Sequence, residues 1–398
     1  MKKILLLGGS AQQIVAIHAA QKRGLYTVLC DYLPDNPGQY EADRFYLVST
    51  TDKDAVLDVA KKEAVDGVLA FASDPAAPTA AYVAKQMHLS GNPLSSVEIL
   101  CNKDRFRRFL HENGFHAPTA FDFTNEASAL AAKDTMPYPV IVKPVDSSGS
   151  KGATVLKTAD GWADAVSFAF SFSRSHRIIA ETFIEKNHPY LIGGDVLVLN
   201  GKIELWGLLN CHRDANVNPL VPVGKSYPLA LAEEDEKKVK TTLQTLVTKL
   251  GIRDCAMNVE LVVDKLHRVW PIDIGPRSGG NMIPDFLGDL FGVDIADLCV
   301  RSAMGEKISL SLRTPQGCYA THNLHSAKDG AYRDIVFAPE LEKHIYRKCL
   351  YKSEGDRVEY FDNASKCLGI LFLKFDDGEQ MEHILSRITE LYEVRLKD

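Results

Sequence analysis

Two acidic residues with apolar neighbours are the first candidates for chemistry. Glu260 and Asp273 stand thirteen positions apart, and residues 264–267 between them read as a hairpin turn, so two antiparallel strands could bring the carboxylates opposite each other. Paired carboxylates repel unless a cation lies between them, and hard oxygen ligands suit Mg²⁺ that bridges substrate phosphates. The alternative is that both residues lie on the solvent face of an amphipathic hairpin.

An arginine follows the second carboxylate. Arg277 lies four residues after Asp273 and precedes the run 278–281, Ser-Gly-Gly-Asn. A guanidinium beside a metal suits the charge that develops on a transferring phosphoryl group. This spacing therefore points to phosphoryl chemistry rather than to a side-chain nucleophile.

A strand that ends in a lysine leads into a loop of small residues. Lys143 closes the apolar run 140–142, and residues 147–152 read Ser-Ser-Gly-Ser-Lys-Gly. A lysine inside an apolar strand is costly to bury without an anionic partner, and small residues let backbone N–H groups turn toward a phosphate. The P-loop pattern GxxxxGK[ST] is absent, and the loop alone is equally compatible with a flexible hairpin turn.

A third segment changes from apolar to polar at residues 178–185, Ile-Ile-Ala-Glu-Thr-Phe-Ile-Glu. A strand that ends in this way can offer backbone N–H and C=O groups to a purine edge and an apolar wall to its face. Half-buried strands with this pattern are common, so this segment alone is a weak signal.

The elements that would position these residues suggest α/β and α+β architecture. The strand 4–7, the turn Gly8-Gly9, the N-cap Ser10 and an apolar helical face open a βαβ unit, and Asp31 ends the second strand, where ligands of parallel sheets bind. Residues 1–95 are therefore predicted as a doubly wound parallel domain. Residues 96–300 form a second domain rich in antiparallel strands, with a subdomain at about 139–185, and residues 301–398 form a small α+β domain ending in a helix from about 378 to 392.

Composition limits the class of protein. The 398 residues are 45% hydrophobic and 25% charged, as in ordinary globular proteins. The net charge of −6 leaves no global positive field for nucleic acid, and no apolar stretch is long enough for a membrane span or a signal peptide. The eight cysteines show no metal-ligand spacing, which favours reduced thiols in a cytoplasmic protein. A homodimer remains open.

In order and spacing, these residues resemble the ATP-grasp superfamily. The resemblance runs over residues 1 to 300 and includes a further lysine, Lys103. The N-terminal domain resembles the one that precedes the ATP-grasp domain in biotin carboxylase. The stretches 72–80 and 368–375 resemble a group labelled carbamoyl-phosphate-synthase-like or phosphoribosylglycinamide-synthetase-like.

The resemblance implies a role for each matching residue. Glu260 and Asp273 would bind Mg²⁺, with Mn²⁺ as a substitute, and Arg277 would steady the acyl phosphate. ATP would be held by Lys103, Lys143, Ser147, Ser148, Gly149, Ser150, Gly152, Glu181, Phe183, Ile184 and His188. Substrate contacts are expected from Gly9, Ser10, Asp31, Ser73, Asp74, Arg213 and Asn281. Two departures from the family pattern stand out: the second metal carboxylate is Asp273 rather than Glu, and Gly275 replaces an Asn that is often a third ligand.

The implied reaction is carboxylate–amine ligation, in which ATP activates a small carboxylate as an acyl phosphate for attack by an amine. An L-amino-acid ligase or a purine-type synthetase would differ only in substrate. More remote alternatives are an inactive ATP-binding protein and an NAD-dependent oxidoreductase. The last is disfavoured because the chain lacks the third glycine of GxGxxG, with Gln12-Gln13 in its place.

Overall fold

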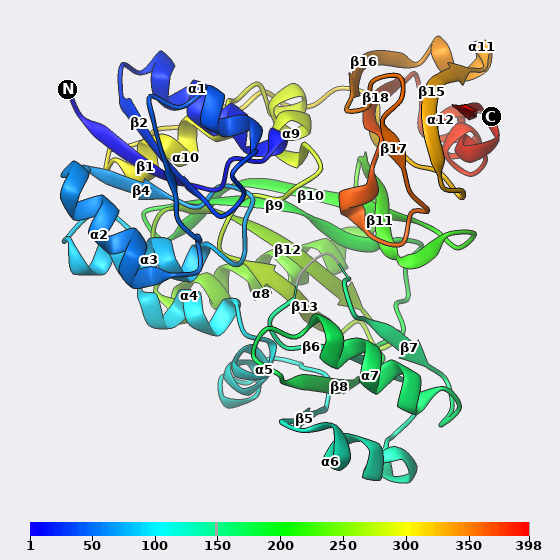
Figure 1. Cartoon of the computed structure of the whole chain (residues 1–398). Helices are drawn as coiled ribbons and strands as arrows, with labels where there is room; N and C mark the ends of the chain where they lie inside the picture. The colour runs from blue at the N-terminus through cyan, green and yellow to red at the C-terminus, as the bar shows by residue number, and fades with distance from the viewer. Residues whose placement is uncertain (148–149, 398) are drawn as a thin grey trace. The chain divides into compact units, whose positions relative to one another are not determined.

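The computed structural model describes residues 1–147 and 150–397 (Figure 1). The chain divides into two compact units, each built from three stretches of sequence. Unit 1 comprises Met1–Asp122, Asp195–Gly207 and Ala232–Thr314, and unit 2 comprises Phe123–Gly194, Leu208–Leu231 and Pro315–Asp398. This grouping cuts across the three consecutive domains that the sequence suggests, because β9 (Leu191–Leu199) and β10 (Lys202–Asp214) each run from one unit into the other.

Unit 1 begins with a parallel sheet, as predicted. Its strands are β1 (Lys3–Leu7), β2 (Tyr26–Asp31), β3 (Arg44–Leu47) and β4 (Gly67–Leu69), in the order β3-β2-β1-β4. The connecting helices are α1 (Ile14–Lys22) and α2 (Lys53–Glu63), and α3 (Ala77–Gln86) follows β4. The strand order reverses at β1, and right-handed crossovers then place α1 and α2 on opposite faces, which makes the sheet doubly wound (Figure 1).

The rest of unit 1 is an antiparallel hairpin with helices. The strands β12 (Cys255–Val263) and β13 (Val269–Gly275) pair antiparallel, and the order in this unit is β13-β12-β9-β10. The helices are α4 (Leu94–Leu100), α5 (Lys103–Glu112), α8 (Glu233–Leu250), α9 (Ile283–Phe291) and α10 (Ile295–Ala303). Helix α8 has four acidic residues in its first turn and ends at Gly251 with φ 62°, which suits the helix dipole and the left-handed cap.

Unit 2 contains a small antiparallel sheet near its start. The chain enters from β5 (Ala120–Phe123), and β6 (Val140–Pro144) pairs on one side with β7 (Thr154–Leu156) and on the other with β8 (Ile178–Thr182). The helices are α6 (Glu126–Ala131) and α7 (Trp162–Phe172). Trp162 is buried in this core, where its indole N–H donates to the Ala129 carbonyl at 2.9 Å.

The C-terminal part of unit 2 is also mostly strand. Here β10 continues a sheet with β11 (Asn218–Tyr227), β14 (Cys318–Leu324), β18 (Gly369–Phe375) and β16 (Ile345–Leu350), in that order. A second sheet has the order β17 (Arg357–Val358), β15 (Gly330–Phe337) and β19 (Tyr392–Lys397). This part of unit 2 also contains two short helices, α11 (Pro339–Glu342) and α12 (Gly378–Leu385).

The predicted C-terminal helix is shorter than expected. It ends at Leu385, and the chain continues through a 3-10 turn into β19, which pairs antiparallel with β15. Residues 386–391, predicted as the last part of this helix, form turns and the 3-10 helix instead, because the pairing of Tyr392 with Phe337 requires the chain to leave the helix earlier. No helix among the described residues is both long and apolar enough to cross a membrane.

Candidate functional site

The two carboxylates of unit 1 stand opposite each other, as the hairpin predicts. Glu260 on β12 pairs with Asp273 on β13, and a register shift follows Glu260. Directly opposed residues of an antiparallel pair project from the same face, so both side chains lie on one side of the hairpin. Lys103, at the first position of α5, places its Nζ 3.9 Å from Asp273 Oδ2, and the Asp273 side chain is 43% exposed. The pair is therefore accessible and already has one cation beside it.

Arg277 is held by a carboxylate from the parallel sheet. Its Nε donates to Asp74 Oδ1 at 2.7 Å, its second terminal nitrogen donates to Asp74 Oδ2, and its Nη1 donates to the Ser278 carbonyl at 2.8 Å. Burial disfavours the charged guanidinium, but the charge and hydrogen bonds of Asp74 outweigh it and raise the pKa of Arg277. Asp74 lies in the loop after β4, next to half-buried Ser73.

Gly275 is explained by this pair. A Cβ at position 275 would lie 2.5 Å from Asp74 Oδ1 and 3.3 Å from Arg277 Nε, closer than side chains pack. The place where the family pattern has an asparagine is therefore filled by the Asp74–Arg277 pair.

Asp195 is a buried carboxylate that sequence reasoning missed. It is 2% exposed on β9, its Oδ2 accepts from the Gly279 N–H at 2.7 Å, and its Oδ1 accepts from Asn258 Nδ2 at 2.8 Å. It thus fixes the chain just after Arg277. An acidic residue inside the apolar run 191–199 was the available signal, by the argument applied to Lys143.

The carboxyl ends of β1 and β2 meet through Asp31. Its Oδ2 accepts from the Gly9 N–H at 2.7 Å and its Oδ1 accepts from the Leu33 N–H at 2.9 Å, with the side chain buried. Ser10 is the N-cap residue of a 3-10 turn, and its Oγ donates to Gln13 Oε1 at 2.8 Å. Both oxygens of Asp31 therefore hold the loops in place, and a substrate contact by Asp31 stays a prediction.

The last expected substrate residue of unit 1 lies close to the same loops. The Asn281 N–H donates to Gln12 Oε1 at 3.2 Å, and its φ of 52° is left-handed, a conformation that asparagine tolerates better than most residues. Unit 1 therefore brings together Gly9, Ser10 and Asp31, and separately Asn281 with the loop after β1.

Unit 2 contains a buried ion pair. Lys143 on β6 places its Nζ 2.7 Å from Glu181 Oε2 on β8, and the two side chains are 9% and 1% exposed. The anionic partner that a buried lysine requires is thus a protein carboxylate in this structure. The expected phosphate contact of Lys143 and adenine contact of Glu181 remain predictions, but their side chains are neighbours.

The small-residue loop is anchored at its described part. Ser150 Oγ donates to the Leu220 carbonyl at 2.8 Å, and Gly152 has φ 72°. A Cβ on Gly152 would lie 2.9 Å from Phe172 and from Pro144, so only glycine fits. Ser147 is half-buried at the loop start. Ser148 and Gly149, which were also expected to bind phosphate, lie outside the described residues.

In the segment after β8, one of the main-chain groups expected to contact a purine already forms a hydrogen bond within the protein. The Phe183 N–H donates to the Pro139 carbonyl at 2.9 Å, so a purine contact would fall to its carbonyl or to half-buried Ile184. His188 is buried, and its carbonyl accepts from Lys186 Nζ at 3.1 Å. Arg213 lies near the end of β10 and donates to the His212 carbonyl at 3.3 Å.

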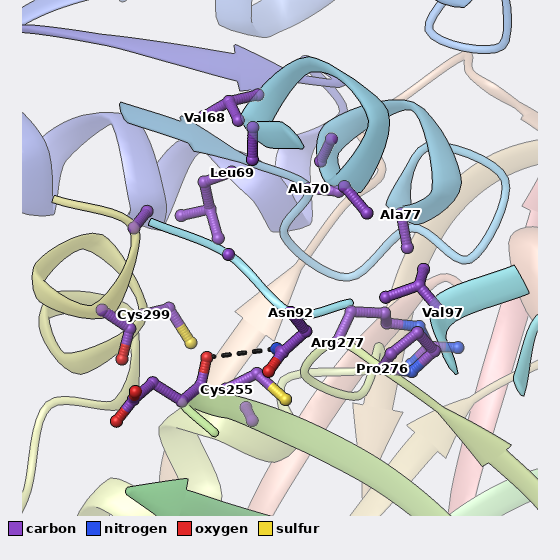
Figure 2. A pocket seen from close by; sticks show the side chains of 18 of the residues that line it. Val68, Leu69, Ala70, Ala77, Asn92, Val97, Cys255, Pro276, Arg277 and Cys299 are labelled. Atoms are coloured by element: carbon purple, nitrogen blue, oxygen red, sulfur yellow. Dashed lines mark hydrogen bonds between the residues drawn. The ribbon is translucent and has the colours of Figure 1, made fainter. Parts of the chain in front are cut away.

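A cavity of about 90 Å³, lined in part by Arg277, lies within unit 1 (Figure 2). Its wall is mostly apolar, with Val68, Ala77 and Val97 on one side and Cys255 and Cys299 on the other. Burial raises the pKa of Cys299 to about 12, so this thiol stays protonated and is a poor nucleophile. The cavity therefore offers a mostly apolar wall, with the Arg277 side chain and Asn92 among its polar lining residues.

Comparisons with known proteins show which proteins this chain resembles. A family model described as an ATP-grasp domain matches residues 136–285. The chain is 24% identical over 324 residues to the carbamoyl phosphate synthase large chain of Thermotoga sp. (strain RQ2), covering 77% of this chain but only 29% of that protein. It is 23% identical over 408 residues to the formate-dependent phosphoribosylglycinamide formyltransferase of Bordetella pertussis, covering 99% and 95% of the two chains.

Among solved structures, the L-amino acid ligase of Bacillus licheniformis superposes with a TM-score of 0.83 at 20% identity, covering 100% of this chain and 99% of that one. At this identity the similarity shows the fold alone. The predicted ATP-grasp resemblance and the predicted fold class are confirmed.

Proposed function

The chain contains an ATP-grasp domain at residues 136–285, and on this premise we propose that the protein is an ATP-dependent carboxylate–amine ligase that forms a C–N bond and releases ADP. The observation that carries the proposal is the direct opposition of Glu260 and Asp273 on β12 and β13. Arg277 follows β13 by two residues.

Magnesium fits the residues that unit 1 provides. Glu260 and Asp273 supply hard oxygen ligands from one face of a hairpin, and the Asp273 side chain is accessible to solvent. Bound there, the ion would polarise phosphate oxygens and offset their charge. Mn²⁺ would fit the same oxygen ligands.

ATP binding is assigned to Lys143 and Glu181 in unit 2, with Lys103 in unit 1 and the 147–152 loop contributing to the phosphates. Lys143 would donate to a phosphate, and Glu181 would accept from the adenine amino group while it keeps Lys143 oriented. Main-chain atoms of Phe183 and Ile184 would complete the adenine contacts, and His188 would contact the ribose.

The proposed reaction has two steps. A carboxylate oxygen of the substrate attacks the γ-phosphorus of ATP, which forms an acyl phosphate as ADP leaves. The amine then attacks the carbonyl carbon, and inorganic phosphate leaves as the C–N bond forms. Arg277 would offset charge on the migrating phosphoryl group, and Asp74 and Asp195 keep it and the chain after it in place.

The substrates are proposed as a small carboxylate and an amine, bound by Gly9, Ser10, Ser73, Arg213 and Asn281. The L-amino acid ligase and the formyltransferase named above are relatives by fold and by sequence, so amino acids and short acids such as formate head the candidates. The eight cysteines are free thiols in the structure, which supports a cytoplasmic setting.

The test is a screen of amino acids and small carboxylates, alone and in pairs, for stimulated release of ADP and phosphate with Mg²⁺ present. Mass spectrometry of the mixture identifies the product. A ligase requires a pair that stimulates both ADP release and product formation, whereas a carboxylate kinase would release ADP with one acid alone. Tight ATP binding with no stimulation by any pair would support an inactive ATP-binding protein instead.

A further inference from the structure

A buried lysine and a buried cysteine face each other in unit 2. Cys211 on β10 and Lys225 on β11 are directly opposed in the antiparallel register, and they are 2% and 6% exposed. The distance between Lys225 Nζ and Cys211 Sγ is 2.6 Å. Neither residue belongs to the ATP or metal groups proposed above.

This distance is short for a hydrogen bond to sulfur. Hydrogen bonds of N–H to oxygen are already about 2.9 Å, and sulfur is the larger atom. Two other thiols of this protein lie 3.7 Å and 3.0 Å from the carbonyl oxygens to which they donate, Cys101 to Asp74 and Cys367 to Gly369. The Lys225–Cys211 approach is shorter than both.

Among the described residues, the Cys211 thiol is the hydrogen-bond partner of the Lys225 amine. Among the residues that the structure describes, Lys225 forms no ion pair, and its Nζ donates only to Cys211 Sγ. Its backbone N–H donates to Thr321 Oγ1 at 3.2 Å, which fixes the strand beneath the side chain. A buried amine without a carboxylate is unusual for a purely structural residue.

We propose that Cys211 and Lys225 are an oxidative modification site, at which the sulfur and the nitrogen become joined through one oxygen atom. Two single bonds through an oxygen bring the end atoms to about the separation found here. The oxidant is dioxygen, which is apolar and small enough to enter a packed interior.

The step balances from the neutral amine and thiol. The thiol S–H bond and one amine N–H bond break, one S–O and one O–N bond form, and the second oxygen atom of dioxygen leaves as water with both hydrogens. Sulfur and nitrogen each lose two electrons, and dioxygen gains four. A thiol reductant reverses the link by reducing the sulfur, as it does for other reversible cysteine oxidation products.

The link would tie β10 to β11 next to Arg213, where the register of the two strands shifts. It would therefore hold the end of β10 in one conformation. This inference is independent of the proposed ligase activity.

The test is peptide mass spectrometry of the full chain, prepared in air and under strict exclusion of air. We expect the air-exposed protein to yield one cross-linked species, which contains Cys211 and Lys225 and has gained one oxygen and lost two hydrogens. Dithiothreitol should convert it to the separate peptides. Heavy-isotope dioxygen should appear in the bridge.

Cys211→Ser and Lys225→Gln should each remove the species, while Cys367→Ser, which changes another buried thiol, should keep it. Where a variant does not fold, the comparison of parent protein with and without air decides alone. Free Cys211 in both preparations, or Cys211 oxidised with Lys225 unmodified, would overturn the proposal.

Discussion

Arg277 and Asp74 lie 203 positions apart and form a two-point ion pair in unit 1. The guanidinium is thereby oriented by a loop of the parallel sheet, although it follows a strand of the antiparallel hairpin. Asp74, which the sequence suggested as a substrate contact, has its carboxylate committed to this arginine.

Asp74→Asn should lower ligase turnover and destabilise the protein. The substitution leaves the charge of Arg277 without its partner in a largely buried place, and breaking such a pair costs about 3 kcal/mol. Urea unfolding and ADP release measure the two effects. Asp58→Asn, at an exposed position of α2, is the control and should change neither.

Gly275→Asn should lower the stability of the protein and should not increase its affinity for Mg²⁺. From sequence alone, an asparagine here would be expected to add a magnesium ligand. The structure fills that place with Asp74 Oδ1, so the new side chain would displace the pair with Arg277. A Mg²⁺ titration of ADP release, together with thermal unfolding, checks this, and a tighter magnesium response at unchanged stability would refute it.

Glu260→Gln or Asp273→Asn should abolish turnover while nucleotide binding largely persists. The carboxylates are assigned to the metal, and the adenine and phosphate contacts are assigned to other residues. Calorimetric ATP binding and magnesium-dependent ADP release separate the two properties. Glu204→Gln, on the more exposed start of β10, provides a matched control. Parent-like activity in both carboxylate variants would eliminate the metal site.

Lys143→Met should cost about 3 kcal/mol of stability, because Glu181 is then left buried without its cation. The double variant Lys143→Met, Glu181→Met should recover most of that stability, since both charges are gone. ATP affinity should be lost in both variants. The exposed pair Lys202–Glu204 at 3.2 Å is the control and should show coupling below about 1 kcal/mol.

Acid should destabilise unit 2 through His212. Burial, then the charges of Lys225 and Arg213, lower the pKa of His212 from 6.5 to about 4. The unfolded chain takes up this proton below pH 6.5, whereas the folded chain takes it up only near pH 4. The free energy of unfolding therefore falls as the pH falls from 6.5 to 4, by up to about 3 kcal/mol. His212→Gln should flatten the loss, and exposed His383→Gln should not; unfolding curves at several pH values test this.

The parts of the site that depend on adjacent segments of sequence could be predicted better than the parts that depend on pairing between distant segments. The hairpin that opposes Glu260 and Asp273 depends on a turn and on two adjacent strands, so it could be predicted from one stretch of sequence. The pairing of Lys143 with Glu181 depends on two strands 38 positions apart, and the sequence indicated only that Lys143 needed an anion.

Asp195 was missed for a related reason. Its partners, Asn258 and Gly279, come from β12 and from the segment after β13. No local sequence pattern predicts that these distant residues meet Asp195. The C-terminal helix was overextended because its predicted end, at about residue 392, is where β19 already pairs with β15, and this pairing requires the helix to end earlier, at Leu385.

The dependence of Arg277 on Asp74 limits how this chain could recombine with its relatives. Exchange of the N-terminal domain between two such proteins would separate the aspartate from the arginine and from the glycine that makes room for them. A chimera whose new N-terminal domain has no aspartate at this position would leave the Arg277 guanidinium without the partner that orients it. Asp74, Gly275 and Arg277 are therefore expected to change together, although domain boundaries drawn along the sequence would place Asp74 in a different domain from the other two.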